Sequence, residues 1–520
     1  MQHPWDRRLG FWYLAEEFPD HPAILEGPDG EYLTMAELAG DAHQLARALR
    51  SAGLVPGDVT AYLLPNSVAM VRWQLACEES GVRYVALNPA LAAAEVQQIL
   101  EMAQAKALLV DASLAEIAPL IATVDSITLR VATGGEVKGF DDLDQLTAAF
   151  ERSPLTDRSL GGPISYSSGT TGRPKGIERP RLGLDPYEEA EKAAIFARAF
   201  QITPLEGCHL ASAGMHHGGC QTFYRGALNV GQPLAIMGRF DAKQTLATIE
   251  RNKVTSAYMV PTQFVRFLKL PDEVKNGYNV SSLQVVAHAA APCPVEVKRK
   301  MMAWWGPVIW ETYGGMEGAA TIAKPERWLE RPGTVGRAIA GMKLRILDDD
   351  GNDLPTGEVG HVYLEPDTPT FEYRNDPDLT ASIHRGKAFT LGDMGYVDAD
   401  GYLFLSDRAK DMIIAGGINI YPAEIEGVLH EHPSVLDVGV IGVPNEDWGE
   451  EVKAIVQLIP GTSPSGQLAE ELIAFTQERL ARFKCPRSVD FVDDLPRTDQ
   501  GKLLKRRLRE SYWKDAERPI

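Results

Sequence analysis

Short apolar runs alternate with helix-period stretches through the first half of the chain, and this alternation restricts the possible architecture strongly. Residues 57–67 form an apolar run ending in turn residues, 68–80 have helical periodicity, and 82–87 form another apolar run. Similar strand-like runs, each beside a helical stretch, recur at 106–111, 127–132 and 253–260. Strands that alternate with helices predict the α/β class with a mostly parallel sheet.

The pattern changes twice in the second half. From Gly333 onward, β-like runs alternate with turn-rich pieces over residues 335–364, which predicts an antiparallel β subdomain. After residues 407–411, helical and strand-like segments predict a small separate α+β domain. Its expected helices are 422–430 and 468–482, and its expected strands are 435–441, 452–458 and 488–491.

Composition excludes several classes of protein. The 520 residues correspond to about three domain-sized units, and 44% hydrophobic residues are enough for a large buried core. The net charge is -19, from 52 Lys and Arg against 71 Asp and Glu, which argues against a nucleic-acid partner because phosphate binding draws on clustered Lys and Arg.

The cysteines and the N-terminus bear on the compartment. The five cysteines are scattered and never form a C-x-x-C pair, which indicates reduced thiols and no zinc ribbon. No apolar segment follows the N-terminus, and no window approaches ~20 consecutive apolar residues. We therefore expect a cytoplasmic protein with no membrane span.

The strongest chemical signal is the segment 164–176, where hydroxyl residues and glycines follow a strand-like start and precede a lysine. Such a loop offers backbone and hydroxyl donors to an anion without side-chain bulk. It is not a Walker A loop, because Lys175 stands three residues after Gly172 and no Ser or Thr follows it. The segment predicts binding of a triphosphate or pyrophosphate. The candidate residues are Ser167, Ser168, Gly169, Thr170, Thr171, Gly172 and Lys175.

This segment resembles the AMP-binding signature of the adenylate-forming superfamily, which contains acyl-CoA synthetases, amino-acid-activating domains and luciferases. Further family-like segments follow in family order: 215–219, 313–317, 390–395, 407–411 with 416–420, and 496–502. The resemblance implies a large N-terminal domain (1–409) of α/β subdomains plus a β subdomain. It also implies a small mobile α+β domain (411–520) that rotates about Lys410 as the hinge.

The resemblance also implies a role for individual residues. Glu317 would bind Mg2+, and Tyr313 would stack on adenine. Asp393 would accept hydrogen bonds from the ribose hydroxyls, and Arg408 would donate a further hydrogen bond to the same sugar. Lys502 would bridge the substrate carboxylate and the α-phosphate. Further nucleotide contacts would come from Ala290, Gly314 and Met316. Gly416 and Gly417 would line the pantetheine channel, and His216 would be a gate to the acyl side. The acyl pocket would include His217, Gly218, Gly219, Ala291 and Gly315.

Two positions depart from the family pattern. Met316 stands where family members have a threonine whose hydroxyl bonds the α-phosphate, and Ala289-Ala290 replaces a pair of glycines. Losing one charge-assisted hydrogen bond would cost about 1.5 to 3 kcal/mol in the step that uses it. The departures therefore bear on adenylation.

The leading interpretation is an AMP-forming acid:CoA ligase that uses ATP, Mg2+ and coenzyme A and forms an acyl-adenylate from a carboxylic acid. Gly214 and the other acyl-side glycines suggest unused side-chain volume, hence a bulky apolar acid. Amino-acid activation is disfavoured because residues 210–223 contain no Asp or Glu to pair an α-ammonium; luciferase activity stays open. One alternative is a half-enzyme that thioesterifies acyl-AMP made by a separate adenylating enzyme. Another is a non-catalytic nucleotide- or CoA-binding protein.

Overall fold

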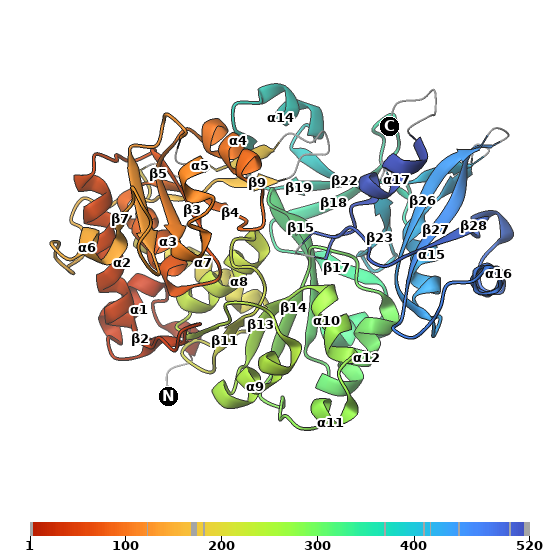
Figure 1. Ribbon diagram of the computed structural model, residues 1–520, viewed down its shortest axis with the longest axis horizontal. Helices are drawn as coiled ribbons and strands as arrows, with labels where there is room; N and C mark the ends of the chain where they lie inside the picture. The colour runs from red at the N-terminus through yellow and green to blue at the C-terminus, as the bar shows by residue number, and fades with distance from the viewer. Residues whose placement is uncertain are drawn as a thin grey trace. The chain divides into compact units, whose positions relative to one another are not determined.

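The computed structural model describes residues 4–121, 123–167, 174–179, 183–368, 371–408, 411–415, 418–445, 448–498 and 501–513 (Figure 1). The chain forms two compact units. The first unit comprises Met1–Met259, Lys269–Ala287 and Thr370–Ala381. The second unit comprises Val260–Leu268, His288–Pro369 and Ser382–Ile520.

A six-stranded parallel sheet in the first unit confirms the predicted strand-helix alternation. Its order is β7-β6-β5-β3-β4-β8. The strands are β3 (Val59–Leu63), β4 (Arg83–Leu87), β5 (Ala105–Asp111), β6 (Leu129–Thr133), β7 (Asp141–Asp142) and β8 (Gly162–Pro163). Helix α3 (Val68–Ser80) has the predicted bounds and ends at Gly81, whose φ of 83° is the left-handed conformation typical of a helix C-terminus.

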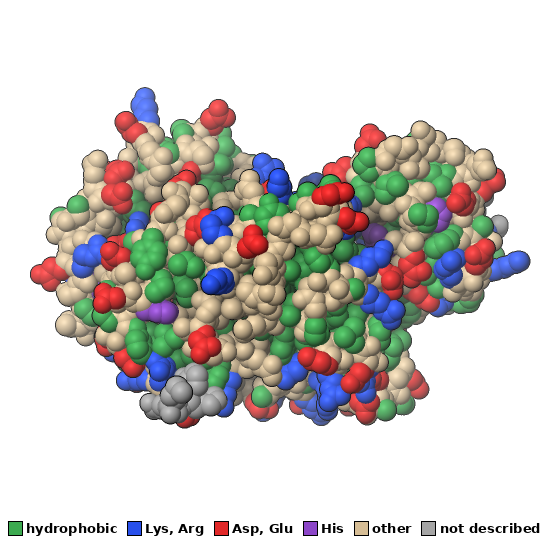
Figure 2. Space-filling model, turned by 90° about the horizontal axis from the view of Figure 1, so that it is seen from below, with side chains coloured by type: hydrophobic (Ala, Val, Ile, Leu, Met, Phe, Trp, Pro, Cys, Tyr) green, Lys and Arg blue, Asp and Glu red, His purple; other side chains and the backbone are tan. Residues whose placement is uncertain are grey.

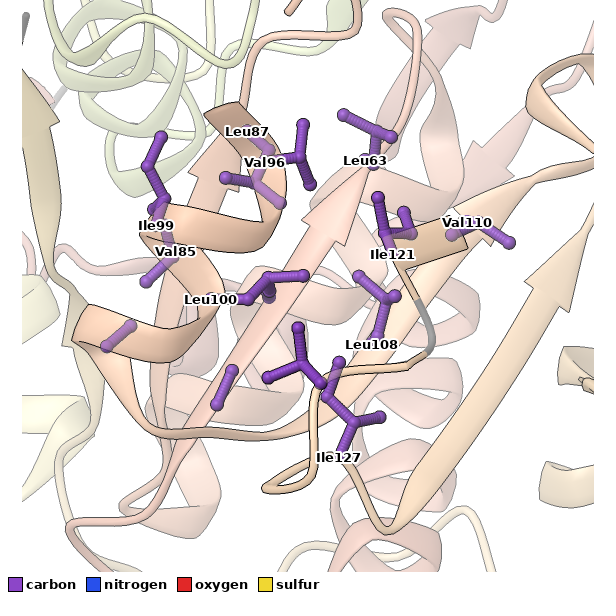
Figure 3. Close-up of a cluster of buried hydrophobic side chains, with 14 of the residues drawn as sticks. Leu63, Val85, Leu87, Val96, Ile99, Leu100, Leu108, Val110, Ile121 and Ile127 are labelled. Carbon is purple, nitrogen blue, oxygen red and sulfur yellow. The ribbon is translucent and has the colours of Figure 1, made fainter. Parts of the chain in front are cut away.

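One face of this sheet packs on α4 (Ala93–Ala103) and α5 (Ala118–Ile121), as Figure 3 shows. Val59, Ala61 and Leu63 of β3 point into this core, since successive side chains of a strand alternate between faces. They meet Leu100 of α4 and Ile121 of α5, both fully buried. The apolar runs of the sequence thus form strands that are covered on this face.

The opposite face of the sheet carries a buried polar network. Trp73 Nε1 donates a hydrogen bond of 3.0 Å to Thr60 Oγ1. Gln74 Nε2 donates to Tyr62 Oη at 2.6 Å and Gln74 Oε1 accepts from Tyr224 Oη at 2.6 Å. Since Tyr224 belongs to α8 (Gly218–Asn229), the network attaches that helix to α3 and β3 and fixes the helix that follows the predicted gate histidine.

The first unit contains two further groups of strands. In the order β2-β1-β12-β11-β13, the pairs are parallel except β1·β2. These strands are β1 (Pro22–Glu26), β2 (Leu33–Thr34), β11 (His209–Ala211), β12 (Leu234–Ile236) and β13 (Ser256–Met259). The antiparallel group β20-β10-β9 consists of β9 (Ser165–Ser167), β10 (Lys175–Glu178) and β20 (Glu372–Tyr373).

The second unit contains the predicted antiparallel strands, in the order β18-β19-β22-β23-β17-β16-β15. Adjacent strands pair antiparallel throughout, which confirms the β subdomain. The strands are β15 (Ile309–Gly315), β16 (Gly318–Ala323), β17 (Thr334–Ala338), β18 (Met342–Leu347), β19 (Gly360–Pro366), β22 (Ala388–Val397) and β23 (Tyr402–Arg408).

The C-terminal part of the second unit has its own sheet and core. Strand β26 pairs antiparallel with β27, β24 pairs antiparallel with β25 and β27, and β28 pairs parallel with β27. Ile425 of α15 and Leu472 of α16 pack fully buried on Val440 and Val456 of the sheet. The elements are β24 (Ile413–Ala415), β25 (Ile418–Ile420), β26 (Val435–Asn445), β27 (Gly449–Leu458), β28 (Ser488–Val492), α15 (Pro422–Leu429), α16 (Gly466–Gln477) and α17 (Lys505–Trp513).

The expected helix 468–482 is shorter at its C-terminal end than its sequence pattern suggests. Helix α16 starts with Ser465 as its N-cap, whose hydroxyl accepts from the Leu468 amide, and it ends at Gln477. Ala481 has an extended ψ of 137°.

The remaining elements connect these sheets. They are α1 (Phe11–Glu17), α2 (Met35–Ser51), α6 (Leu143–Thr147), α7 (Pro186–Ala199), α9 (Ala242–Asn252), α10 (Pro261–Leu268), α11 (Asp272–Lys275), β14 (Val285–His288), α12 (Val295–Trp305), α13 (Pro325–Glu330), α14 (Pro377–Ile383) and β21 (His384–Arg385). None of the helices in the described parts of the chain has the length and apolar character that are needed to cross a bilayer.

On the face that Figure 2 presents, Lys and Arg side chains are interspersed with Asp and Glu side chains.

Acidification is expected to destabilise the fold through His209 of β11. Burial lowers the pKa of the His209 imidazole to about 3, whereas an unfolded histidine titrates near ~6.5. Between these values the unfolded chain binds a proton that the native chain does not. This single group should therefore lower the free energy of unfolding by about 1.4 kcal/mol for each pH unit below ~6.5, with no contribution above it.

Urea unfolding at pH 7.5, 6.5 and 5.5 would measure this dependence. The variant His209→Gln should show a shallower loss of stability toward acid, because glutamine does not titrate. A parent-like slope in His209→Gln would show that other groups control the acid response.

Candidate functional site

Tyr313 and Asp393, two residues of the expected nucleotide site, meet in the second unit although they are 80 positions apart. The Tyr313 hydroxyl on β15 donates a hydrogen bond of 2.7 Å to Asp393 Oδ2 on β22. Each residue is only 9% exposed. An aromatic ring beside a fixed carboxylate can stack on a base and accept hydrogen bonds from ribose hydroxyls.

The turn that joins β15 to β16 shows why glycines occupy it. A Cβ on Gly314 would lie 2.4 Å from the Gly318 carbonyl oxygen, so the two backbones approach too closely for a side chain. A Cβ on Gly315 would lie 2.4 Å from Glu317 Oε2, because the Glu317 carboxylate folds back over Gly315. The turn thus holds the predicted Mg2+ ligand in the same unit as Tyr313. Met316 lies between them and adds no hydroxyl donor.

A single carboxylate at this turn suits Mg2+ better than a metal held by protein alone. Among the described residues, no group of three or more His, Cys, Asp or Glu side chains could hold an ion. Mg2+ commonly takes one or two carboxylates and completes its shell with phosphate oxygens and water. Glu317 therefore fits a magnesium ion that arrives with a nucleotide.

The segment after β14 has an unusual backbone at Ala290. Its φ is +74°, the left-handed region that a residue with a Cβ enters at a cost of about 1 kcal/mol relative to glycine. Ala290 and Ala291 belong to the second unit. Strained backbone of this kind tends to occur at functional sites, and the expected family residue at position 290 is glycine.

Behind this segment lies a buried charge cluster that the sequence analysis missed. The Lys298 ammonium on α12 is 2.7 Å from Glu311 Oε2 on β15, and Lys298 is fully buried. His288 Nε2 is 3.5 Å from the same oxygen, and the Lys298 Nζ lies 4.6 Å from the Trp328 ring centroid. The cluster joins the helix after the alanine segment to the strand that carries Tyr313.

The protonation states within this cluster follow from its burial. Burial, and then the Lys298 charge, lowers the pKa of His288, so the imidazole stays neutral. Burial alone would raise the pKa of the Glu311 carboxyl, but Lys298 and His288 outweigh it and hold this pKa below its usual range. The cluster is an ion pair beside a neutral histidine. Its sequence signal was Lys298 lying on the stripe of Met301, Met302 and Trp305, which helical periodicity places on one face.

In the first unit, His216 and His217 stand directly before α8, with ring centroids 3.9 Å apart. Burial, with the neighbouring His217, lowers the pKa of His216 well below its ordinary value, so this imidazole is neutral at pH 7. Gly218 and Gly219 begin the helix. The predicted gate residue and three of the predicted acyl-side residues are therefore consecutive at one helix N-terminus, whereas Ala291 and Gly315 belong to the second unit.

The expectation that the acyl-side glycines leave volume unused is wrong at three positions. A Cβ on Gly219 would lie 2.5 Å from Tyr258 Oη, and one on Gly214 would lie 2.7 Å from His216 Cε1. At Gly315 the space is taken by Glu317. The protein's own side chains thus fill the space beside these glycines, which cannot by themselves indicate a large ligand.

The structure describes the predicted phosphate-binding segment only in part. Strands β9 and β10 flank it and pair antiparallel, with Ser167 opposite Lys175, which agrees with the predicted strand before the loop. The Lys175 Nζ lies 5.6 Å from the Tyr373 ring centroid within the first unit. The side chain of Ser167 and the residues Ser168, Gly169, Thr170, Thr171 and Gly172 lie outside the described residues.

Other predicted residues are placed by backbone alone or lie outside the described residues. Arg408 of β23 pairs with Asp393 of β22 in the sheet, and its side chain is not described. Lys410, Gly416 and Gly417 also lie outside the described residues. The predicted hinge and domain division therefore stay predictions. Lys502 lies in the second unit and is partly buried.

A pocket of about 260 Å³ opens on the C-terminal part of the second unit. Trp448 and Phe483 are 43% and 48% exposed at its rim, and the Arg487 guanidinium lies 4.8 Å from the Trp448 ring centroid. Arg482 also lines it. Exposed aromatic rings with adjacent guanidinium groups suit a flat ligand with anionic groups, although Glu450 and Glu451 also line the pocket. The sequence signal was the run Arg482-Phe483-Lys484 with Arg487 nearby.

Comparison with known proteins places these features in a family. Residues 11–370 match the AMP-binding enzyme family and 424–502 match the AMP-binding enzyme C-terminal domain. The chain is 31% identical to a fatty acid–[acyl-carrier-protein] ligase, ScoC, of Streptomyces coeruleorubidus (98% of this chain, 96% of the relative). It is 33% identical to a feruloyl-CoA synthase of Amycolatopsis sp. (97% and 99%).

Two solved structures of similar proteins match this chain over nearly its whole length. The anthranilate CoA ligase AuaEII in complex with anthranoyl-AMP has a TM-score of 0.87 at 25% identity, covering 99% of this chain and 100% of that one. ATP-bound MatB from Rhodopseudomonas palustris has a TM-score of 0.84 at 28% identity, covering 98% and 100%. The predicted fold class is confirmed, and the CoA ligases of this family use the predicted ATP, Mg2+ and coenzyme A. The chain belongs to the AMP-binding enzyme family of adenylate-forming proteins.

Proposed function

We propose that the protein is an AMP-forming carboxylic acid:CoA ligase. In the first half-reaction the acid carboxylate attacks the α-phosphate of ATP, giving acyl-AMP and pyrophosphate. In the second, the CoA thiol attacks the acyl carbonyl, giving acyl-CoA and AMP. The observation that carries the proposal is the hydrogen-bonded pair of Tyr313 and Asp393, in the same unit as Glu317 and Lys502.

Each residue of this group has a task in adenylation. Tyr313 stacks on the adenine. Asp393 accepts hydrogen bonds from the ribose hydroxyls and also accepts one from the Tyr313 hydroxyl, which holds the ring in place. The Lys502 ammonium offsets the charge that develops as pyrophosphate leaves. Glu317 binds Mg2+, which supplies Lewis-acid stabilisation of the phosphate oxygens.

The second half-reaction uses the C-terminal part of the chain. The pocket of Trp448, Phe483, Arg482 and Arg487 accepts the nucleotide end of CoA, because its rings can stack on adenine and its guanidinium groups can pair with phosphates. We place the pantetheine arm at Gly416 and Gly417 on the resemblance alone. Between the two half-reactions, rotation about Lys410 would move Lys502 away from the reacting phosphate and bring the pantetheine arm of CoA to the acyl-AMP.

The acid is proposed to be apolar, because the groups around the start of α8 are uncharged. Neutral His216 lies at the start of α8, where the Tyr258 hydroxyl lies over Gly219 and the Tyr258 ring stacks on Phe223 at 5.1 Å. These groups carry no formal charge, so an aromatic or otherwise apolar acyl group would find compatible neighbours. Ferulate and anthranilate, the acids named for two similar proteins, belong to this class.

Met316 supports a second candidate function. The turn that carries Glu317 has no side-chain hydroxyl for the α-phosphate, and this bears on adenylation only. A half-enzyme would then thioesterify acyl-AMP supplied by a separate adenylating enzyme. Lys502 and Glu317 favour the complete ligase, because their proposed tasks belong to adenylation. The Tyr313–Asp393 pair would serve the nucleotide in both half-reactions and so does not separate the two candidates.

A panel of carboxylic acids, assayed twice, tests the proposal. One assay measures ATP-dependent pyrophosphate release, and the other measures thioester formation from synthetic acyl-AMP and CoA. The complete ligase predicts both activities with the same preferred acid, most strongly for aromatic acids. Thioester formation without pyrophosphate release would establish the half-enzyme, and binding of ATP or CoA without either activity would establish a non-catalytic protein.

A further inference from the structure

Lys502 follows a turn whose backbone is tightly closed. The Thr498 amide donates to the Lys502 carbonyl at 2.9 Å, and the Gly501 amide donates to the Thr498 carbonyl at 2.7 Å. The Lys502 amide donates to Thr498 Oγ1 at 3.2 Å. Gly501 has a φ of +79°, which glycine adopts without strain. The two residues between Thr498 and Gly501 lie outside the described residues.

Arg497 connects this turn to the sheet with all three guanidinium nitrogens. Its Nε donates to Asp437 Oδ2 and its Nη2 to Asp437 Oδ1, each at 2.6 Å. Its Nη1 donates to the Gly501 carbonyl at 2.5 Å. Asp437 belongs to β26. One planar group therefore joins a strand carboxylate to the peptide unit that enters Lys502, and such two-point pairs fix orientation as well as distance.

The turn is held on its other sides too. A Cβ on Gly501 would lie 2.2 Å from Thr262 Cγ2, so the turn contacts the start of α10 directly. A Cβ on Gly439 would lie 2.6 Å from Leu503 Cδ2, so the residue after Lys502 packs on the same strand as Asp437. Movement of the backbone at Lys502 therefore requires that the Arg497–Asp437 contact open or shift.

We propose that Arg497 and Asp437 are positioning residues for Lys502, which they hold ready for adenylation by locking the turn before it. This inference rests on the proposed function, in which Lys502 acts on ATP. A lysine has four flexible methylene groups, and a fixed backbone removes one source of misplacement. A displacement of about 1 Å at a reacting group can cost ~10²-fold in rate, whereas Lys502 has no task in thioester formation.

The test compares the two half-reactions in full-length variants. Arg497→Met, which keeps the chain length but loses every donor, should reduce kcat for acyl-AMP formation by ~10- to 10²-fold. Thioester formation from supplied acyl-AMP should stay within ~2-fold, which also shows that the variant is folded. Arg497→Lys keeps the positive charge but not the two-point pairing with the carboxylate, and Asp437→Asn keeps the side-chain shape but not the negative charge. Each should give a smaller loss of rate that is confined to adenylation.

A matched control comes from a second forked pair in the same unit. Arg345 donates to Asp353 through Nε at 2.9 Å and Nη2 at 2.7 Å, on β18. Arg345→Met should leave both half-reactions unchanged. The double variant Arg497→Met/Asp437→Asn should be no slower than Arg497→Met, because both changes remove one interaction.

Three outcomes decide the inference. Selective loss of adenylation that is partly restored in Arg497→Lys supports it. Equal loss in both half-reactions would make the pair merely structural, and normal adenylation in Arg497→Met would make it unnecessary. Failure of the proposed function is distinguishable, since the parent enzyme would then release no pyrophosphate and the variants would have no adenylation rate to lose.

Discussion

Replacing Lys502 by alanine is expected to slow acyl-AMP formation by ~10²- to 10³-fold or more, because a preorganised positive charge is removed from the site where phosphate charge develops. Thioester formation from supplied acyl-AMP should continue near the parent rate. Pyrophosphate release from ATP and thioester formation from synthetic acyl-AMP measure the two effects separately.

The neighbouring basic residues supply the control for this prediction. Arg506→Ala removes an exposed charge from α17 that lies 3.6 Å from Glu510, so it should leave both half-reactions unchanged. If Lys502→Ala slowed both half-reactions equally, the lysine would have a structural task or the family position would be assigned to the wrong residue.

Replacing Asp393 by alanine should lower kcat/KM for ATP by ~10²-fold or more. The variant loses the carboxylate proposed to accept the ribose hydroxyls, and it leaves the buried Tyr313 hydroxyl without the bond of 2.7 Å. Charged hydrogen bonds contribute about 1.5 to 3 kcal/mol each, so the loss of two gives this magnitude. Steady-state kinetics with varied ATP at a saturating acid would measure it.

Tyr313→Phe separates the two tasks of Asp393. It removes the hydroxyl-carboxylate bond and keeps the aromatic ring and the carboxylate. Its effect on kcat/KM for ATP should be ~10-fold or less, because this bond is already present before ATP binds and only its orienting effect on the carboxylate is lost. An Asp393→Ala enzyme no weaker toward ATP than Tyr313→Phe would show that the carboxylate serves the tyrosine only and not the ribose.

The sequence predicts local elements and motif positions well because both depend on short-range patterns. The helix 68–80 was delimited correctly, since a strand-turn pattern precedes it and a glycine follows. Gly314 is explained by the close approach of the Gly318 backbone in the paired strand. The strand expected before the predicted phosphate-binding segment is also present, and it pairs with a strand after that segment.

Contacts between side chains that lie far apart in the sequence could not be predicted from it, for a physical reason. Asp437 and Arg497 are 60 positions apart, and nothing in either neighbourhood distinguishes them from solvated charges until the fold brings them together. Lys298 was missed because a lone lysine on a helix is usually exposed, and its partner Glu311 comes from another element. The error about Gly219 has the same origin, because Tyr258 fills the space from a different strand.

The buried Lys298–Glu311 pair also constrains how this chain can change during evolution. Removing either partner alone would leave an unpaired charge in the interior, at a cost of about 3 to 5 kcal/mol, whereas replacing both by apolar groups of similar volume is often neutral. Descendants can therefore lose the pair only by two coordinated changes, and intermediates with one change would be removed by selection. The partly exposed rim of Trp448 and Phe483 is not under this restriction. Related sequences should accordingly conserve or replace positions 298 and 311 together, while the rim of the pocket varies one residue at a time.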